Sequence, residues 1–378
     1  MWQGAKDPCY STIFTINNNK GWMQTILQIF ILLLLSVLFS LLVIIFTKKL
    51  FYKYKILDNP KKFWKKRKPV PYGMWVVFFV CFFTLSALFI DPNNKLFLIW
   101  GFWFLVTIVS FLDDMYQVSA KKRLLVQIII WAVIWITSIK IGYISNIFWG
   151  ILDLETYKII IFDYSIFIIP LIFTIVWYVF IFNALNWTDW ISGNTSGLSI
   201  ISFFILFLLW YILFLGDNYD WSIENASFIM KMTTILVWII VPFWWFDIRE
   251  KILMGDSWTM FLGFMLATIA IISGWKVATV LVVFGIYTVD AIYVVVRRLL
   301  QWKSPLKWDL THIHHRLLDL WLKRKEVLFL LYTLSFLFGL TALFLDRFGK
   351  ILVFIIIIFV VVFMNRIVDS LYLKRKKK

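Results

Sequence analysis

Successive apolar runs of membrane-spanning length are the feature that most constrains the fold of this chain. Each run holds roughly 17–22 residues with few charges, and about 20 apolar residues carry a helix across the hydrocarbon core of a bilayer. Hydrophobic residues make up 62% of the 378 positions, well above the roughly 45–50% of soluble domains. The sequence therefore predicts an all-α, polytopic integral membrane protein.

The runs predict about eleven transmembrane helices, which form one catalytic domain over residues 26–366. Residues 1–25 are expected to be an extracytoplasmic segment, and the first run, too long for a signal peptide, is expected to be retained. Residues 367–378 form a basic tail, and the alternating polarity of residues 142–164 indicates a short hairpin. The helices are expected near residues 26–47, 74–90, 95–112, 124–141, 165–182, 198–216, 228–245, 259–273, 277–296, 326–345 and 350–366.

The positions of Lys and Arg predict the orientation of these helices. The chain carries 38 Lys and Arg residues against 21 Asp and Glu residues, a net charge of +17. With the N-terminus outside, most basic residues fall on one side, which the positive-inside rule identifies as cytoplasmic. They would also attract anionic lipid headgroups, whereas no soluble domain exists to bind nucleic acid. The cytoplasmic segments are then 48–73, 113–123, 183–197, 246–258, 297–325 and the C-terminal tail.

The polar clusters of the chain all fall in or beside these segments, although the orientation rests on Lys and Arg alone. An acidic pair between two membrane-length runs suggests a functional site at the lipid–water boundary. In a helix over residues 119–127, Ser119, Arg123 and Gln127 would share one face. The candidate catalytic residues are Asp113, Asp114, Asp189 and Asp256, and the candidate substrate-binding residues are Asn183, Asn186, Arg123, Arg298, His312, His314 and His315.

These residue types suit phosphoryl transfer at a membrane surface. Carboxylates are hard ligands for Mg²⁺ or Mn²⁺, and Arg binds phosphate oxygens in a bidentate manner. Phosphoryl transfer depends mainly on positioning and charge neutralisation. Simpler interpretations stay open for each cluster. The acidic pair, Asn183 and Asn186 can cap helix ends, and Gly255-Asp256-Ser257 can be a plain N-cap. The histidines can form a surface cluster or a zinc site.

Five motifs occur in an order that resembles a known family, the polyprenyl-phosphate N-acetylhexosamine-1-phosphate transferases. The resemblance covers about residues 57–325, and the family also includes the phospho-MurNAc-pentapeptide translocases. The His-x-His-His form is similar to the N-acetylhexosamine branch. The motifs are Pro69-Val70-Pro71-Tyr72-Gly73; Asp113-Asp114 with Ser119, Arg123 and Gln127; Asn183-x-x-Asn186-x-x-Asp189; Met254-Gly255-Asp256-Ser257 with Phe261-Leu262-Gly263-Phe264; and Asp290, Arg298, Ser304-Pro305, Asp309 and His312-Ile313-His314-His315.

The resemblance implies a multi-pass enzyme of the cytoplasmic membrane with its active site on the cytoplasmic face. It would transfer N-acetylglucosamine-1-phosphate, or another N-acetylhexosamine-1-phosphate, from a UDP-sugar to undecaprenyl or another polyprenyl phosphate, releasing UMP. This reaction begins the membrane stage of cell-envelope glycan synthesis, such as lipopolysaccharide or teichoic-acid linkage. Family relatives are often homodimers.

The resemblance also implies residue roles. Asp256 and Asn186 would bind Mg²⁺, with Mn²⁺ as an alternative, and Asp113 and Asp114 would orient or deprotonate the lipid phosphate. The histidines and Arg298 would hold the sugar and the diphosphate.

Departures from the family pattern leave two alternatives open. The central motif of the family usually runs Asp-Gly-x-Asp-Gly, whereas this chain has Asp189-Trp190-Ile191-Ser192-Gly193. Trp258-Thr259 replaces the usual Gly-Ser after the glycine–aspartate motif. Two tryptophans in place of glycines could narrow the cleft or reshape the sugar pocket. The alternatives are a catalytically inactive homologue and a lipid or sugar transporter, which would place its polar residues near mid-membrane.

Overall fold

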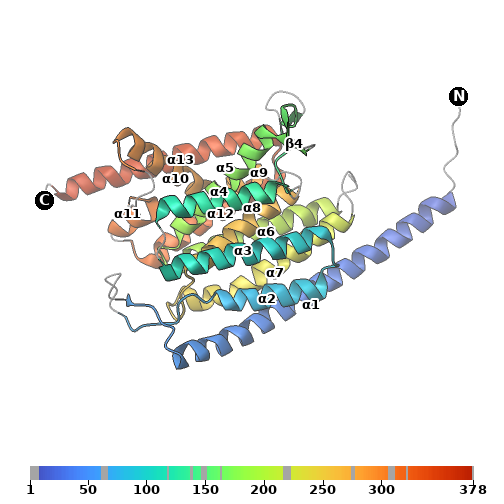
Figure 1. The fold of residues 1–378 in the computed structure, drawn as a ribbon, viewed down its shortest axis with the longest axis horizontal. Helices are drawn as coiled ribbons and strands as arrows, with labels where there is room; N and C mark the ends of the chain where they lie inside the picture. The colour runs from blue at the N-terminus through green and yellow to red at the C-terminus, as the bar shows by residue number, and fades with distance from the viewer. Residues whose placement is uncertain are drawn as a thin grey trace.

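The structure, a computed structural model, is a bundle of helices that run roughly along one axis (Figure 1). It describes residues 8–60, 67–116, 119–136, 139–145, 151–161, 164–215, 223–273, 277–304, 311–320 and 322–376. The helices are α1 (Pro8–Lys53), α2 (Trp75–Phe89), α3 (Asn94–Tyr116), α4 (Ala120–Ile136), α5 (Ile168–Thr188), α6 (Asn194–Leu215), α7 (Ile223–Asp247), α8 (Asp256–Ile272), α9 (Val277–Val283), α10 (Gly285–Leu300), α11 (Ile313–Asp319), α12 (Arg324–Phe344) and α13 (Arg347–Lys376).

A helix occupies each range in which the sequence predicts a span, and the ninth range is divided between α9 and α10, which meet at an angle of 81°. Within the described ranges, six helices are long and apolar enough to cross a membrane, and the bent pair makes a seventh candidate. Shorter apolar helices occur in α2, α3 and α8. The multi-pass helical architecture is therefore confirmed, whereas about eleven spans and their orientation stay predictions.

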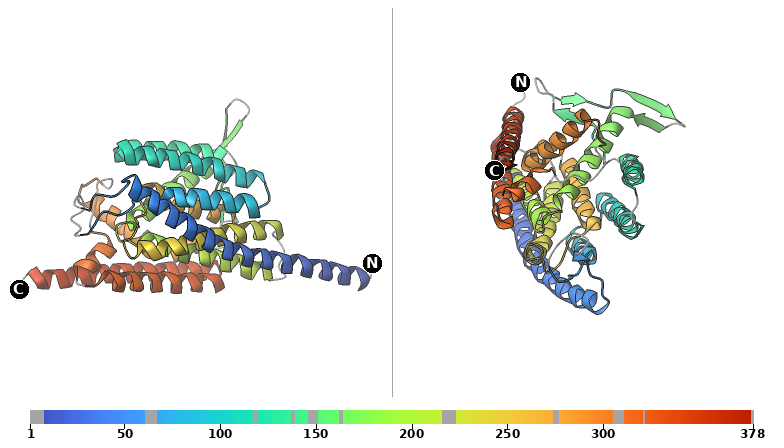
Figure 2. Two further views of the ribbon diagram at one scale, coloured as in Figure 1. Left: turned by 90° about the horizontal axis from the view of Figure 1, so that it is seen from below. Right: turned by 90° about the vertical axis from the view of Figure 1, so that its left-hand side faces the viewer.

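The segment between α4 and α5 contains the short strands of the fold. Strands β1 (Tyr143–Ser145) and β2 (Ile151–Asp153) pair antiparallel, as do β3 (Lys158–Ile161) and β4 (Tyr164–Phe167). The two hairpins project from one side of the bundle (Figure 2). The hairpin predicted from the alternating polarity of residues 142–164 is thus confirmed, with one strand pair more than expected.

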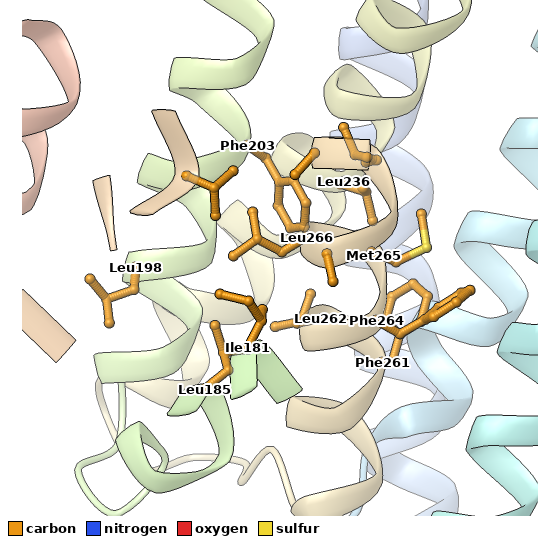
Figure 3. Close-up of a cluster of buried hydrophobic side chains, with 14 of the residues drawn as sticks. Ile181, Leu185, Leu198, Phe203, Leu236, Phe261, Leu262, Phe264, Met265 and Leu266 are labelled. Atoms are coloured by element: carbon orange, nitrogen blue, oxygen red, sulfur yellow. The ribbon is translucent and has the colours of Figure 1, made fainter. Parts of the chain in front are cut away.

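Helices α7 and α8 form the centre of the bundle. The most apolar window of α7 is 83% buried, against 28% for α1 and α13. Helix α8 packs closely on α5 at Gly263. A Cβ added there would lie only 3.0 Å from the Cα of Phe182, so the close approach requires glycine. Figure 3 shows the buried cluster around them, in which Ile181, Leu262 and Leu266 lie together. Close packing of this kind holds the ends of α5, α7 and α8 in a fixed relation.

The outer surface of the bundle is apolar. Large hydrophobic side chains are exposed along α1 and α13, among them Leu38, Leu42, Phe359 and Phe363. Water would penalise exposed apolar area of this extent, whereas lipid tails would not. The exterior therefore fits a chain whose solvent is the bilayer.

Candidate active site at one end of the bundle

The junctions that carry the predicted site residues lie at the same end of the bundle. From α3 to α8, successive helices run in opposite directions. The α3–α4, α5–α6 and α7–α8 junctions therefore share the end at which α13 finishes, on the left of Figure 1. Helix α11 lies at this end as well. Contacts between described residues connect these junctions with one another.

The central Asn/Asp motif closes α5 and bonds to α8. Asn186 donates from Nδ2 to Oγ1 of Thr259 over 2.8 Å, and Thr259 is fully buried. Asp189 is the C-cap residue of α5, and its N–H donates to the Asn186 carbonyl. Because the Asn186 nitrogen is bound to Thr259, its Oδ1 is the side-chain atom suited to ligating a cation.

The same motif bonds to α4. Asn183 donates from Nδ2 to Oε1 of Gln127 over 2.9 Å and to the carbonyl of Val179, one turn earlier in α5. The N–H of Arg123 donates to the Ser119 carbonyl, so the predicted helical turn from Ser119 is confirmed. Arg123 and Gln127 both line an apolar pocket, as their shared helix face predicts; its other walls come from α3, α5 and α8.

The acidic residues are placed by their backbones. Asp113 and Asp114 lie in the last turns of α3, and Asp256 is the first residue of α8; the side chains of all three lie outside the described part of the structure. Ser110, one turn before the acidic pair, donates to the sulfur of Met260, one turn after Asp256, over 2.8 Å. The acid-bearing ends of α3 and α8 therefore lie side by side, while the roles of the carboxylates stay predictions.

The proline–glycine segment packs against the glycine–aspartate motif. The N–H of Leu253 donates to the Pro71 carbonyl over 2.9 Å. Gly255 has φ 86° and ψ 159°, a conformation that is essentially restricted to glycine. A Cβ at this position would lie 3.2 Å from the Cα of Gly73. Two glycines thus allow the backbones of the first and fourth motifs to meet directly before Asp256.

The three histidines form a buried cluster between α5 and α10. Their rings contact one another, with centroid distances of 5.7 Å for His312–His314 and 4.4 Å for His314–His315. Trp187 lies 5.6 Å from the His312 ring, and Trp190 lies 5.3 Å from the His315 ring. These contacts connect the central motif to the late histidine loop.

His314 lies in the middle of this cluster. Its side chain is 1% exposed, and neither ring nitrogen has a hydrogen-bond partner among the described residues. Burial, together with the neighbouring His315 and His312, holds the pKa of His314 well below its ordinary value of 6.5. A neutral imidazole results, with one nitrogen to donate and one to accept.

The remaining parts of the late loop are placed only in part. Arg298 is buried and donates from Nε to the Ser304 carbonyl over 2.9 Å, while Pro305 and Asp309 lie outside the described residues. Among the described side chains, no three His, Cys, Asp or Glu residues gather as a metal site.

Comparison with known proteins gives a matching family model and several relatives. The sequence model described as glycosyl transferase family 4 matches residues 96–274, which contain the acidic pair, the central motif and the glycine–aspartate motif. The chain is 24% identical to a probable undecaprenyl-phosphate N-acetylglucosaminyl 1-phosphate transferase of Bacillus subtilis (strain 168), over 94% of this chain and 95% of the relative. The chain is therefore similar to glycosyl transferase family 4.

Other relatives represent two branches of the family. The undecaprenyl-phosphate alpha-N-acetylglucosaminyl 1-phosphate transferase of Salmonella typhi is 27% identical, over 74% of this chain and 73% of the relative. The phospho-N-acetylmuramoyl-pentapeptide-transferase of Staphylococcus saprophyticus is 26% identical, over 68% of this chain and 78% of the relative. The resemblance inferred from the motifs is therefore confirmed.

An acid that the sequence did not predict at this site, Asp247, contacts the central motif. Where the family usually has a second acid, this chain has Ser192. In the structure, Oδ2 of Asp247, at the end of α7, accepts hydrogen bonds from the Gly193 N–H over 3.0 Å and the Ser196 hydroxyl over 2.7 Å. Asp247 is 2% exposed. An acid at the end of an apolar run was the available signal, the same signal that identified Asp113 and Asp114.

The two tryptophans at family glycine positions have different surroundings. Trp258 is 1% exposed and stacks on Phe261 at 5.2 Å, with Phe243 also in contact. It belongs to the apolar core between α2, α7 and α8, and the effect of the two tryptophans on the cleft or the sugar pocket stays a prediction. Trp190 is half-buried against His315.

Proposed function

We propose that this chain transfers N-acetylglucosamine-1-phosphate, or another N-acetylhexosamine-1-phosphate, from a UDP-sugar to a polyprenyl phosphate such as undecaprenyl phosphate. The chain is a transferase similar to glycosyl transferase family 4. The observation that carries the substrate assignment is its likeness, over nearly the full length of both chains, to a probable undecaprenyl-phosphate N-acetylglucosaminyl 1-phosphate transferase. The meeting of the predicted motifs at one end of the bundle supports it.

The proposed reaction is a direct in-line attack. An oxygen of the lipid phosphate forms a bond to the β-phosphorus of the UDP-sugar as the bond from that phosphorus to the bridging oxygen breaks. UMP leaves with the bridging oxygen, and the sugar remains on a lipid-linked pyrophosphate. A phosphate monoester with a second pKa near 6 is mostly dianionic at pH 7. Asp113 and Asp114 would therefore mainly orient the nucleophile rather than remove a proton.

Mg²⁺, or alternatively Mn²⁺, is the ion that the donor chemistry of this end fits. Asn186 keeps Oδ1 for a cation because Nδ2 is bound to Thr259, and Asp256 begins α8 directly beside the Gly73–Gly255 contact. Carboxylate and amide oxygens are the ligands that this ion takes. When bound, it would neutralise charge on the diphosphate.

The lipid substrate would approach along α4. Arg123 lines the apolar pocket together with Ile130, Phe182 and Met260, so a cation stands at the edge of an apolar surface. A prenyl chain against that surface would place its phosphate near Arg123 and the end of α3. Gln127 and Asn183 hold α4 and α5 together at this level.

The sugar-diphosphate donor would lie against the histidine cluster. Arg298 would bind phosphate oxygens. The neutral His314 would donate one hydrogen bond to the sugar and accept another from it. Asp189 would lie between the two substrates, since its backbone adjoins Asn186 and its neighbour Trp190 touches His315. Because the positive-inside rule assigns this end to the cytoplasm, the donor would be a cytoplasmic nucleotide sugar.

A transporter is the less favoured alternative. It would place its polar residues around a central cavity near mid-membrane. The connected motifs here lie at helix ends, and the core between α5, α7 and α8 is apolar (Figure 3).

The decisive experiment measures UMP release by detergent-purified protein. The assay contains Mg²⁺, undecaprenyl phosphate and one UDP-N-acetylhexosamine at a time. We expect release that requires the lipid and one donor, which would also identify the sugar. No release with any donor, from protein shown to be folded by a cooperative melting transition, would contradict the proposal and favour the inactive homologue.

A further inference from the structure

Asp290 uses both carboxylate oxygens to hold the start of the histidine loop. It lies on α10 and is 2% exposed. Its Oδ2 is 2.8 Å from Nδ1 of His312, and its Oδ1 accepts the N–H of Ile313 over 3.0 Å. His312 is the N-cap residue of α11 but makes no side-chain cap of its own. The carboxylate of Asp290 thus satisfies the first N–H of α11 from a neighbouring helix.

The remaining contacts of the His312 ring come from two other elements. Trp187, at the end of α5, lies 5.6 Å from it at an interplanar angle of 30°. The His314 ring lies 5.7 Å from it and nearly parallel, at 5°. With Asp290 on its edge and rings on its faces, His312 is held from α5, α10 and α11.

This arrangement decides which ring nitrogen carries the proton. An ionised carboxylate only accepts hydrogen bonds, and the second oxygen is taken by a backbone N–H. Nδ1 must therefore be the protonated nitrogen of His312, and Nε2 is the nitrogen left for a ligand. A hydrogen bond at one ring nitrogen generally sets the role of the other in this way.

We propose that Asp290 is a positioning residue that fixes His312 in the Nδ1–H tautomer and so presents Nε2 to the sugar-diphosphate donor. In that tautomer, Nε2 accepts a hydrogen bond from a hydroxyl or amide N–H of the sugar. The identity of that ligand rests on the proposed function, whereas the tautomer rests on the contacts of Asp290 alone.

The test combines nitrogen NMR with turnover. The full-length protein in detergent, labelled with ¹⁵N in histidine, contains only three histidines, so His314→Gln and His315→Gln assign the ring signals. The variant is Asp290→Asn, whose amide can donate to Nδ1 while its oxygen still accepts the Ile313 N–H. The matched control is Asp319→Asn, an exposed acid on the same short helix α11.

At pH 8 we expect wild-type His312 to carry its proton on Nδ1 and the Asp290→Asn ring to carry it on Nε2. Turnover should fall about 10- to 100-fold in Asp290→Asn, as for other residues that orient a functional histidine, and should be unchanged in Asp319→Asn. A protonated Nε2 in wild type overturns the proposal without any variant. So does an unaltered tautomer in Asp290→Asn, or a switched tautomer with full turnover. Wild-type protein that turned over no donor would contradict the proposed function, and the ring signals would still support or overturn the role of Asp290.

Discussion

Asn186 on α5 and Thr259 on α8 are joined by a hydrogen bond of 2.8 Å from Nδ2 to Oγ1. Thr259 follows Trp258 at the place where the family usually has Gly-Ser. The hydroxyl that reaches Asn186 is therefore retained, while the glycine is replaced by a tryptophan that packs into the core. The departure in this motif leaves the contact between the two proposed metal-ligand segments in place.

Replacing Thr259 with valine tests that contact. Valine keeps the shape but removes the acceptor, which leaves the Asn186 amide without this partner at a cost of about 1–3 kcal/mol. We expect Thr259→Val to raise the Mg²⁺ concentration needed for half-maximal UMP release. Thr259→Ser, which keeps the hydroxyl, should behave like wild type. Equal Mg²⁺ dependence in both variants would contradict the role given to Asn186.

Asp256 is the residue on which the metal assignment depends most. Asp256→Asn removes one charge from the proposed Mg²⁺ site, and we expect UMP release to become undetectable while the thermal transition is retained. Asp346→Asn is the control, because Asp346 is an exposed acid that caps the start of α13 through the Gly349 N–H, a role that Asn fills equally well. Wild-type turnover in Asp256→Asn would refute the assignment.

Replacing Gly255 tests the close contact between its backbone and that of Gly73, directly before α8. At φ 86° and ψ 159°, a side chain is strained by about 1–3 kcal/mol, and the added Cβ would also press on Gly73 at 3.2 Å. Gly255→Ala should lower the melting temperature and reduce turnover. Gly101→Ala is matched to it, because Gly101 lies within α3 and has nothing within 4 Å of the added Cβ. There alanine should be neutral or slightly stabilising.

The features that the sequence could predict are those set by local composition. The ranges of the apolar helices and the shared face of Arg123 and Gln127 follow from run length and helical period, and the structure bears them out. The 81° bend between α9 and α10 has a single local signal, Gly285 directly after Phe284. Glycines are frequent in membrane helices, so this one residue does not predict a bend.

The sequence predicted which residue types form the candidate site but not which of them contact one another. Asp290 and His312 were both named, but the hydrogen bond between them depends on how the chain returns after α10. Trp187 was not predicted as a site residue, because a tryptophan at the end of an apolar run is typical of an interfacial anchor. Only the packing of α5 against α10 shows that it covers His312. Partners that are distant in sequence are decided by tertiary packing, which periodicity does not encode.

Asp247 provides a test of the acid that reaches the central motif from another helix. Asp247→Ala would leave the Gly193 N–H and the Ser196 hydroxyl buried without this acceptor, each at about 1–3 kcal/mol. We expect a lower melting temperature and reduced turnover. A double-mutant cycle with Ser196→Ala should be non-additive, because both changes remove the same hydrogen bond. Additive losses in melting temperature would show that the two residues act separately.

The lowered pKa of His314 predicts that the folded protein loses stability as the pH falls. Its pKa is lowered in the folded protein by burial and by the neighbouring histidines, whereas in the unfolded chain it is near 6.5. Below pH 6.5 the unfolded state therefore binds a proton that the folded state does not. Unfolding becomes easier as pH falls, by at most about 1.4 kcal/mol per pH unit for one group. His314→Gln removes this proton uptake.

The measurement is the melting temperature of detergent-purified wild type and His314→Gln between pH 8 and pH 5. Above pH 7, His314 is neutral in both the folded and the unfolded wild-type protein. The difference in melting temperature between wild type and His314→Gln should therefore be constant there. Below pH 6.5 the wild type should lose stability faster than His314→Gln, because only the wild type has an imidazole that charges on unfolding. Parallel curves down to pH 5 would contradict the prediction, because they would mean that the folded protein does not lower the pKa of His314.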